Sequence, residues 1–137
     1  MDFVIDASVA VAWSLEDEAS ALAEEVLDAI ESGDGHAPAI WPFEVANALL
    51  SAERRKRIVP GATKRLLDAL SSLEIEIDPL ATLEHLDVEL ALAREHGLSV
   101  YDASYLSLAV RFGLPLATLD ERLRTAAAGA GVALLVA

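Results

Sequence analysis

The chain has 137 residues, 54% of them hydrophobic, which suffices for one buried core without covalent cross-links. It contains no cysteine, which excludes disulfide frameworks, thiolate metal sites and cysteine nucleophiles. The formal net charge of −13 argues against a uniformly basic surface for nucleic acid, although the ten Lys and Arg residues all follow residue 53.

Short apolar or alternating stretches predict five strands, and 3.6-residue periodicity predicts the helices between them. The predicted strands are residues 3–5, 37–40, 74–78, 114–118 and 132–136. The predicted helices are residues 8–15, 18–30, 42–57, 62–73, 82–96, 102–112 and 120–128. Alternating strands and helices indicate an α/β fold, with a parallel sheet flanked by helices on both faces. We expect a single domain over residues 1–137.

Acidic residues follow the predicted strands. Asp6 comes directly after the first strand, and Asp120 follows the fourth. Asp102 opens a predicted helix, and Glu44 lies in the first turn of another. Ligands of parallel sheets bind beyond the carboxyl ends of the strands, so we expect these four acids to meet at one edge of the sheet.

Each acid taken alone has a structural explanation, because Asp caps helix N-termini and a negative charge suits a helix's first turn. Clustered carboxylates repel one another, however, and persist when a cation binds among them. An all-oxygen set suits Mg²⁺ or Mn²⁺. The histidines His36, His85 and His96 show no metal-ligand spacing and are expected to be ordinary surface or helix-end residues.

Four segments around these acids resemble one family in order and approximate spacing. They are residues 4–8 (VIDAS), 42–47 (PFEVAN), 101–109 (YDASYLSLA) and 116–123 (LATLDERL). Each is a weak pattern alone, but together they span essentially the whole chain. The sequence resembles a PIN-domain nuclease, and more narrowly the VapC-type toxins of type II toxin–antitoxin pairs. The resemblance implies a helix-flanked parallel sheet, a homodimer, and Mg²⁺- or Mn²⁺-dependent cleavage of RNA.

The resemblance carries the family's four acids onto Asp6, Glu44, Asp102 and Asp120. We expect Asp6 to be the central metal ligand, because the first strand is expected to lie mid-sheet. Asp102 and Asp120 would complete the ligand set, and Glu44 would bind a second metal or orient the attacking water. No Ser-His or Cys-His arrangement can be proposed, so water activated by the metal is the expected nucleophile.

Three further positions match the family. Ser8 and Thr118 fall on its hydroxyl positions, where they either donate hydrogen bonds to the ligands or only cap helices. Asn47 follows Glu44 by about one turn and is expected to hold its carboxylate. Arg122 departs from the family, many members of which have another acid there, so the resemblance leaves open whether one metal or two are held.

A basic run, Arg54-Arg55-Lys56-Arg57, ends the helix predicted to carry Glu44. Cations favour helix C-termini, so the run is either a solvated helix end or a grip on RNA phosphates. Trp13 and Trp41 are expected to be core or dimer-interface residues rather than platforms for base stacking.

The resemblance also implies a cognate antitoxin. We expect this partner to place an Arg or Lys of a basic or amphipathic tail among the carboxylates, and to dock an apolar segment near Trp13 or Trp41. The chain shows no secretory signal and no apolar run near the roughly 18 residues that span a bilayer, so a cytoplasmic protein is expected.

Three alternatives remain to be weighed. A catalytically weak PIN-like binding module would be marked by loss of an acid, and all four are present. A phospho-accepting receiver-type domain needs a lysine after a late strand, whereas the last lysine here is Lys64. A nucleotide-binding α/β protein would have a glycine-rich loop after the first strand, where Asp6-Ala7-Ser8-Val9 contains no glycine.

Overall fold

The fold is built on a parallel sheet. The structure is a computed structural model that describes residues 1–15, 21–32, 34–79 and 82–135. Its strands are β1 (Phe3–Ile5), β2 (Gly35–Ala37), β3 (Ile75–Ile77) and β4 (Leu116–Ala117), in the order β3-β2-β1-β4. All neighbouring strands pair in parallel, and Val4 of β1 aligns with His36 of β2 and Leu116 of β4. β1 therefore lies mid-sheet, as the sequence predicts, and β3 lies at an edge.

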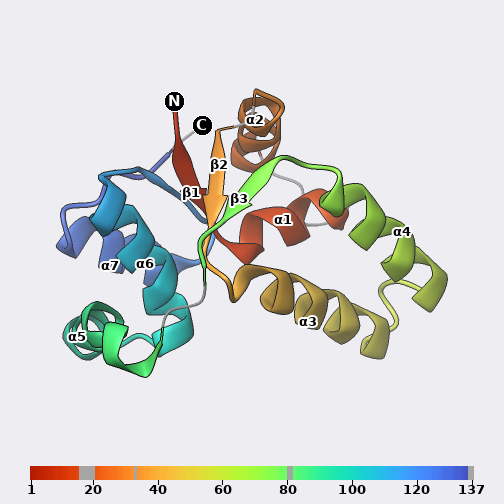
Figure 1. The fold of residues 1–137 in the computed structure, drawn as a ribbon. Coiled ribbons are helices and arrows are strands. Elements are labelled where there is room, and N and C mark those ends of the chain that lie inside the picture. The colour runs from red at the N-terminus through yellow and green to blue at the C-terminus, as the bar shows by residue number, and fades with distance from the viewer. Residues whose placement is uncertain (16–20, 33, 80–81, 136–137) are drawn as a thin grey trace.

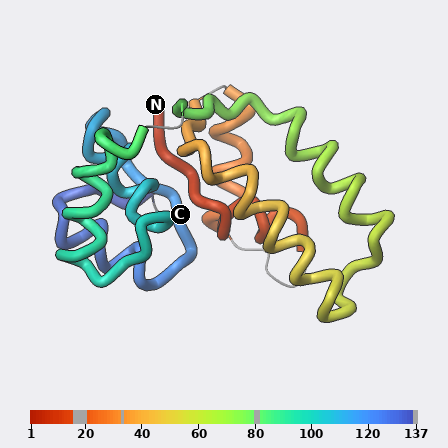
Figure 2. Tube along the Cα trace, turned by 60° about the horizontal axis from the view of Figure 1, so that its bottom comes forward, coloured from red at the N-terminus to blue at the C-terminus, as the bar shows by residue number. Residues whose placement is uncertain are grey.

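Helices cover both faces of this sheet. The α-helices of the described residues are α1 (Ala7–Ser14), α2 (Ala21–Ile30), α3 (Trp41–Arg54), α4 (Pro60–Ser71), α5 (Asp87–His96), α6 (Val100–Phe112) and α7 (Glu121–Gly129). α5, α6 and α7 lie on one side of the strands, and α1, α3 and α4 lie on the other (Figures 1 and 2). Because both faces are covered, Phe3, Val4 and Ile5 are fully buried, which explains the unbroken apolar run of β1. No described helix has the length and apolar character needed to cross a membrane.

α3 and α4 form a helical hairpin that extends away from the sheet (Figure 1). α3 begins with Pro42 in its first turn and ends where Lys56 adopts a left-handed backbone, with φ of 60°. The N–H groups of Lys56 and Arg57 donate to the carbonyls of Glu53 and Ala52, both at 2.9 Å, which is the hydrogen-bond pattern of a Schellman motif. The basic run therefore curls off the end of α3.

Several predicted boundaries were wrong. The strand predicted over residues 37–40 instead covers Gly35–Ala37. It ends before Pro38, because Pro38 has no N–H for the ladder and its carbonyl accepts from the Trp41 N–H at 3.0 Å. A side chain at position 35 would crowd Ile30, since an added Cβ would lie 3.2 Å from Ile30 Cγ1. Glycine therefore suits this buried strand position.

The other differences are at helix and chain ends. The helix predicted over residues 42–57 ends at Arg54, and the one predicted over 62–73 runs from Pro60 to Ser71. The helix predicted over residues 82–96 is divided into a 3₁₀ turn, Leu83–His85, and α5. The last predicted strand is reduced to a bridge between Leu134 and Leu116 in the described residues, and part of it lies outside them. The predicted start of the helix over 18–30 also lies outside the described residues.

Candidate active site

Asp6 stands at the carboxyl end of the central strand and caps α1. Its Oδ1 accepts hydrogen bonds from the Ser8 N–H at 3.1 Å and from Ser8 Oγ at 2.6 Å. Its Oδ2 accepts from Thr118 Oγ1 at 2.6 Å. The residue is only 5% exposed. A carboxylate is thus held in a fixed orientation, almost out of contact with solvent.

The two hydroxyls also bind the loop that follows β4. Thr118 Oγ1 accepts from the Asp120 N–H at 3.0 Å, and Ser8 Oγ accepts from the Leu119 N–H at 2.9 Å. Asp120 then caps α7, because its Oδ1 accepts from the Arg122 and Leu123 N–H groups. Ser8 and Thr118 therefore link Asp6 to the segment that carries the exposed Asp120. They donate to Asp6 directly and also fix the loop that follows β4, whereas the helix caps here are Asp6 and Asp120.

Glu44 is held from across the molecule. It lies half-buried in the first turn of α3, and its Oε1 accepts a hydrogen bond from the hydroxyl of Tyr105 on α6. Tyr105 is 1% exposed, so its ring belongs to the core while its hydroxyl reaches the carboxylate. Sequence reasoning missed this residue. One signal was available, since Tyr105 follows Asp102 by three residues and shares its side of the helix.

Asp102 occupies the first turn of α6 rather than opening the helix. Ser99 is the N-cap, and its Oγ accepts from the Asp102 N–H at 3.0 Å. The predicted start of this helix at residue 102 was therefore wrong, and capping does not account for Asp102. Asp102 is half-buried, and the charge of Asp120 lies close enough to raise the pKa of Asp102.

Comparison with known proteins shows the family of the chain. Residues 3–129 match the PIN domain family, which is nearly the whole chain. The chain belongs to the PIN-domain family.

Curated relatives of this PIN domain come from Pyrobaculum aerophilum. "Ribonuclease VapC3" is 32% identical over 123 residues, which cover 90% of this chain and 92% of the relative. "Exonuclease VapC9" is 38% identical over 89 residues, or 64% of this chain and 63% of the relative. The chain is therefore a VapC-type homologue.

Solved structures agree on the fold. The crystal structure of PAE2754 from Pyrobaculum aerophilum is 31% identical and superposes with a TM-score of 0.69, covering 92% of this chain and 79% of that one. A toxin–antitoxin complex from Klebsiella pneumoniae contains a chain that superposes with a TM-score of 0.60 at 20% identity, with 87% of each chain covered. At that identity the second likeness shows the fold alone.

Burial and repulsion by neighbouring carboxylates disfavour the charged forms of Asp6, Glu44 and Asp102 in this PIN domain. Burial raises the pKa of Asp6 to about 6, against the hydrogen bonds from Ser8 and Thr118, and Asp120 adds to the rise. Burial also raises the pKa of Glu44, and the charges of Asp102 and Asp120 add to that effect. For Asp102, burial and Asp120 raise the pKa, while the nearby Arg122 partly opposes them. The charge of Asp120 thus raises the pKa of each of the other three predicted acids, and the charge of Asp102 also raises that of Glu44.

The donor set suits a hard divalent cation, because it consists of carboxylates that destabilise one another's charge. As the side chains stand, no three His, Cys, Asp or Glu residues in the described ranges lie close enough together to hold a metal ion. The carboxylates are instead oriented by hydroxyl and backbone donors.

The remaining predicted residues lie outside this cluster. Asn47 is exposed one turn along α3 from Glu44, whose carboxylate is held by Tyr105. The residues of the basic run are exposed at the far end of α3, and Arg54 lies about 15 Å along the helix from Glu44. Trp41 is buried at 7% exposure, and the half-buried Trp13 donates its indole N–H to the Ala23 carbonyl. Both tryptophans are therefore packed against the core, and the buried Trp41 offers little surface for an antitoxin.

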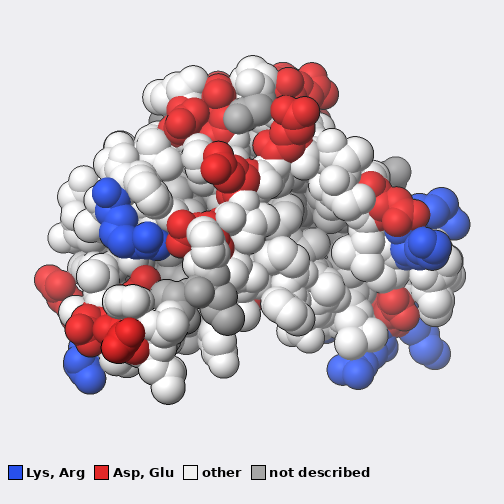
Figure 3. All heavy atoms as spheres, viewed as in Figure 1, with Lys and Arg blue, Asp and Glu red and all other residues white. Residues whose placement is uncertain are grey.

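Charge is unevenly spread over the surface. Figure 3 shows Lys and Arg mainly around the outer ends of α3 and α4, with others on the side of α5 and α6, and Asp and Glu over the region of α2 and the strands and over α5. Six of the ten cations belong to the α3–α4 hairpin, namely Arg54, Arg55, Lys56, Arg57, Lys64 and Arg65. A net acidic chain thus has one locally basic arm.

Proposed function

We propose that this VapC-type PIN domain is the toxin of a toxin–antitoxin pair and cuts RNA by metal-dependent hydrolysis. The observation that carries the proposal is the hydroxyl-bridged pair Asp6 and Asp120 at the carboxyl ends of β1 and β4, with Glu44 and Asp102 in electrostatic contact. The curated relatives are named as a ribonuclease and an exonuclease, which supports a nuclease reaction here.

The four acids would hold Mg²⁺ or Mn²⁺, with Asp6 as the central ligand and Asp102 and Asp120 beside it. When bound, such an ion lowers the pKa of water and stabilises charge on a phosphodiester. Ser8 and Thr118 keep both oxygens of Asp6 oriented. Tyr105 holds one oxygen of Glu44, which leaves the other free to bind an ion or orient the attacking water.

The partners follow from the same proposal. RNA would be the substrate, with the exposed run Arg54-Arg55-Lys56-Arg57 contacting phosphates on one side of the cluster. A cognate antitoxin with a basic or amphipathic tail would inhibit by pairing cations with the carboxylates. We also propose that the toxin acts as a homodimer in the cytoplasm.

A closed circular RNA tests the reaction and distinguishes endonuclease from exonuclease activity, because a circle has no ends. We expect the purified protein to linearise the circle in Mg²⁺, to stop in EDTA and to resume when Mg²⁺ is restored. Shortening of linear RNA with the circle left intact would replace the endonuclease assignment by an exonuclease. Full activity in EDTA would contradict metal dependence.

A further inference from the structure

A groove is formed in part by elements that also carry the carboxylates. It has a volume of about 520 Å³ and lies between the β2–α3 connection and helices α5 and α6. Its walls are mainly apolar and include Ile40, Leu86, Val88 and Val100, with the exposed ring of Tyr101 at its edge. This size lies within the range of small-ligand sites.

One groove-lining side chain has unused hydrogen-bonding capacity. Glu89 of α5 is 6% exposed, and its Oε1 accepts from Ser107 Oγ of α6 at 2.8 Å. Its Oε2 is buried without a hydrogen-bond partner, one of three such side-chain atoms among the described residues. A buried carboxylate oxygen without a donor is costly, so each case in a folded protein calls for an explanation.

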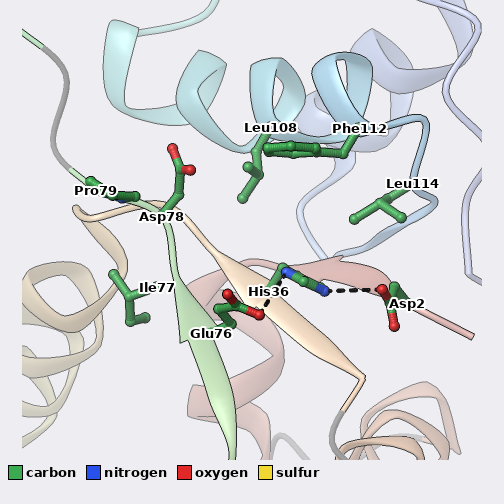
Figure 4. Close-up of a pocket in the computed structure, with 9 residues that line it drawn as sticks. All are labelled: Asp2, His36, Glu76, Ile77, Asp78, Pro79, Leu108, Phe112 and Leu114. Atoms are coloured by element: carbon green, nitrogen blue, oxygen red, sulfur yellow. Dashed lines mark ion pairs between the residues drawn. The ribbon is translucent and has the colours of Figure 1, made fainter.

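Other charged groups of the groove already have partners. Asp78 accepts from Arg111 Nη2 at 3.1 Å, and Arg111 Nε donates to Ser107 Oγ at 3.3 Å. Asp78 and Pro79 also line an adjoining hollow, in which His36 lies between Asp2 and Glu76, 3.4 Å and 4.0 Å away (Figure 4). Of the carboxylates that line the groove, Glu89 is therefore the one with a buried oxygen that lacks a hydrogen-bond donor.

The groove shares its supporting elements with the candidate active site. Tyr101 directly precedes Asp102 on α6 and lies one turn before Tyr105. Ile40 is the N-cap of α3, whose first turn carries Glu44. A strand of RNA whose scissile phosphate lies at the carboxylates would therefore pass this groove with a neighbouring nucleotide.

We propose that the groove is a base-recognition subsite that takes one unstacked nucleobase of the RNA substrate, an inference that rests on the proposed function. Apolar walls suit the faces of a base, and Glu89 Oε2 accepts a hydrogen bond from an amino group on its edge. Carboxylates repel phosphate, so the sugar–phosphate backbone stays outside. Guanine, adenine and cytosine carry an exocyclic amino group, whereas the only donor on the pairing edge of uracil is N3–H, which lies between two carbonyl oxygens that a carboxylate repels. The subsite therefore selects against uracil.

Binding of short oligonucleotides tests this selection. The probes are an all-uridine RNA and three variants with a single G, A or C, and their binding is measured by fluorescence anisotropy in EDTA to prevent cleavage. We expect at least one amino-bearing base to bind about tenfold more tightly than uracil, as expected for one hydrogen bond to a charged acceptor. Glu89→Gln keeps an oxygen for Ser107 but puts an amide N–H₂ in place of Oε2, so the preference for amino-bearing bases over uracil should disappear.

Two further variants keep the test sharp. Glu95→Gln removes the same charge from an exposed position of α5 and should retain the preference. If Glu89→Gln does not fold, Ala39→Leu fills the groove without touching Glu89 and should abolish the preference equally. Equal affinity for all four probes, or an unchanged preference in Glu89→Gln, would overturn the subsite and leave the nuclease proposal standing. A protein that neither binds nor cuts any RNA would overturn both.

Discussion

Asp6 lies in an environment that disfavours its charge. Its pKa of about 6, against an ordinary 3.8, means that the folded chain holds the proton more tightly than the unfolded chain does. The resulting stabilisation is fully present below pH 3.8 and is lost as the pH rises through about 6. At neutral pH and without metal, the ionised Asp6 therefore costs about 3 kcal/mol of folding stability.

Asp6→Asn removes this cost. In EDTA at pH 7 we expect the variant to exceed the parent in free energy of unfolding by about 1–2 kcal/mol, because the amide keeps only one of the two acceptor oxygens. The advantage should shrink towards zero near pH 4, where Asp6 is protonated anyway. Urea unfolding across this pH range measures it. A variant that is less stable than the parent at pH 7 would show that the hydroxyl bonds outweigh burial.

Tyr105 gives a second residue-scale prediction. Tyr105→Phe keeps the buried ring but removes the donor to Glu44, so stability should fall by about 1 kcal/mol. Cleavage should fall roughly tenfold or more in kcat, with little change in KM, because Glu44 is no longer held. Tyr101→Phe removes the same hydroxyl from an exposed residue of the same helix and is the control, because it should leave stability unchanged. Wild-type kcat in Tyr105→Phe would reduce Tyr105 to a packing residue.

The residues that could be predicted from the sequence are those set by local position. Asp6 directly follows β1 and Asp120 closely follows β4, with Ser8 two residues after Asp6 and Thr118 two residues before Asp120. Because β1 and β4 are parallel neighbours, the sheet brings these four residues together. Tyr105 could not be found in this way, because its bond to Glu44 spans 61 residues and depends on how α6 packs near α3. Glu89 could not be singled out either, because its burial depends on the packing of α5 against α6.

At the scale of elements, α3 joins two chemistries. Glu44 occupies its first turn, the basic run begins at its last residue, Arg54, and the left-handed Lys56 turns the run away from the helix axis. Sequence patterns predicted the helix but not its end, because a Schellman motif usually has glycine where Lys56 stands. Likewise the apolar letters of residues 37–40 suggested a strand, whereas pairing with Phe3 and Val4 selects Gly35 and His36.

The basic run gives a prediction at this scale. Replacing Arg54, Arg55 and Arg57 together with alanine should weaken RNA binding and lower the slope of log K against log salt. The slope should fall by roughly 0.7 for each phosphate of single-stranded RNA that the variant no longer neutralises. The triple lysine variant keeps the charges and should retain the slope. Salt titration of RNA binding measures both. An unchanged slope in the alanine variant would leave the run as a solvated helix end.

For the whole molecule, the net charge of −13 and the clustered carboxylates favour a cationic inhibitor. We expect the antitoxin's Arg or Lys and the divalent ion to compete for the same acids, so the complex should weaken as Mg²⁺ or Mn²⁺ concentration rises. Titrating the metal against a preformed complex, at constant ionic strength, measures the competition. Affinity that ignores both the metal and charge reversal of the partner's tail would place inhibition elsewhere on the chain.

The most direct test of the carboxylate mechanism is the rate at which Asp6→Asn cuts RNA in saturating Mg²⁺. Asp6 is proposed as the central ligand, so its loss should slow cleavage by at least about a hundredfold, beyond the usual effect of residues that merely orient ligands. Asp68→Asn makes the same change at an exposed position of α4 and should cut at the parental rate. A folded Asp6→Asn protein that cuts RNA as fast as the parent would contradict the carboxylate mechanism.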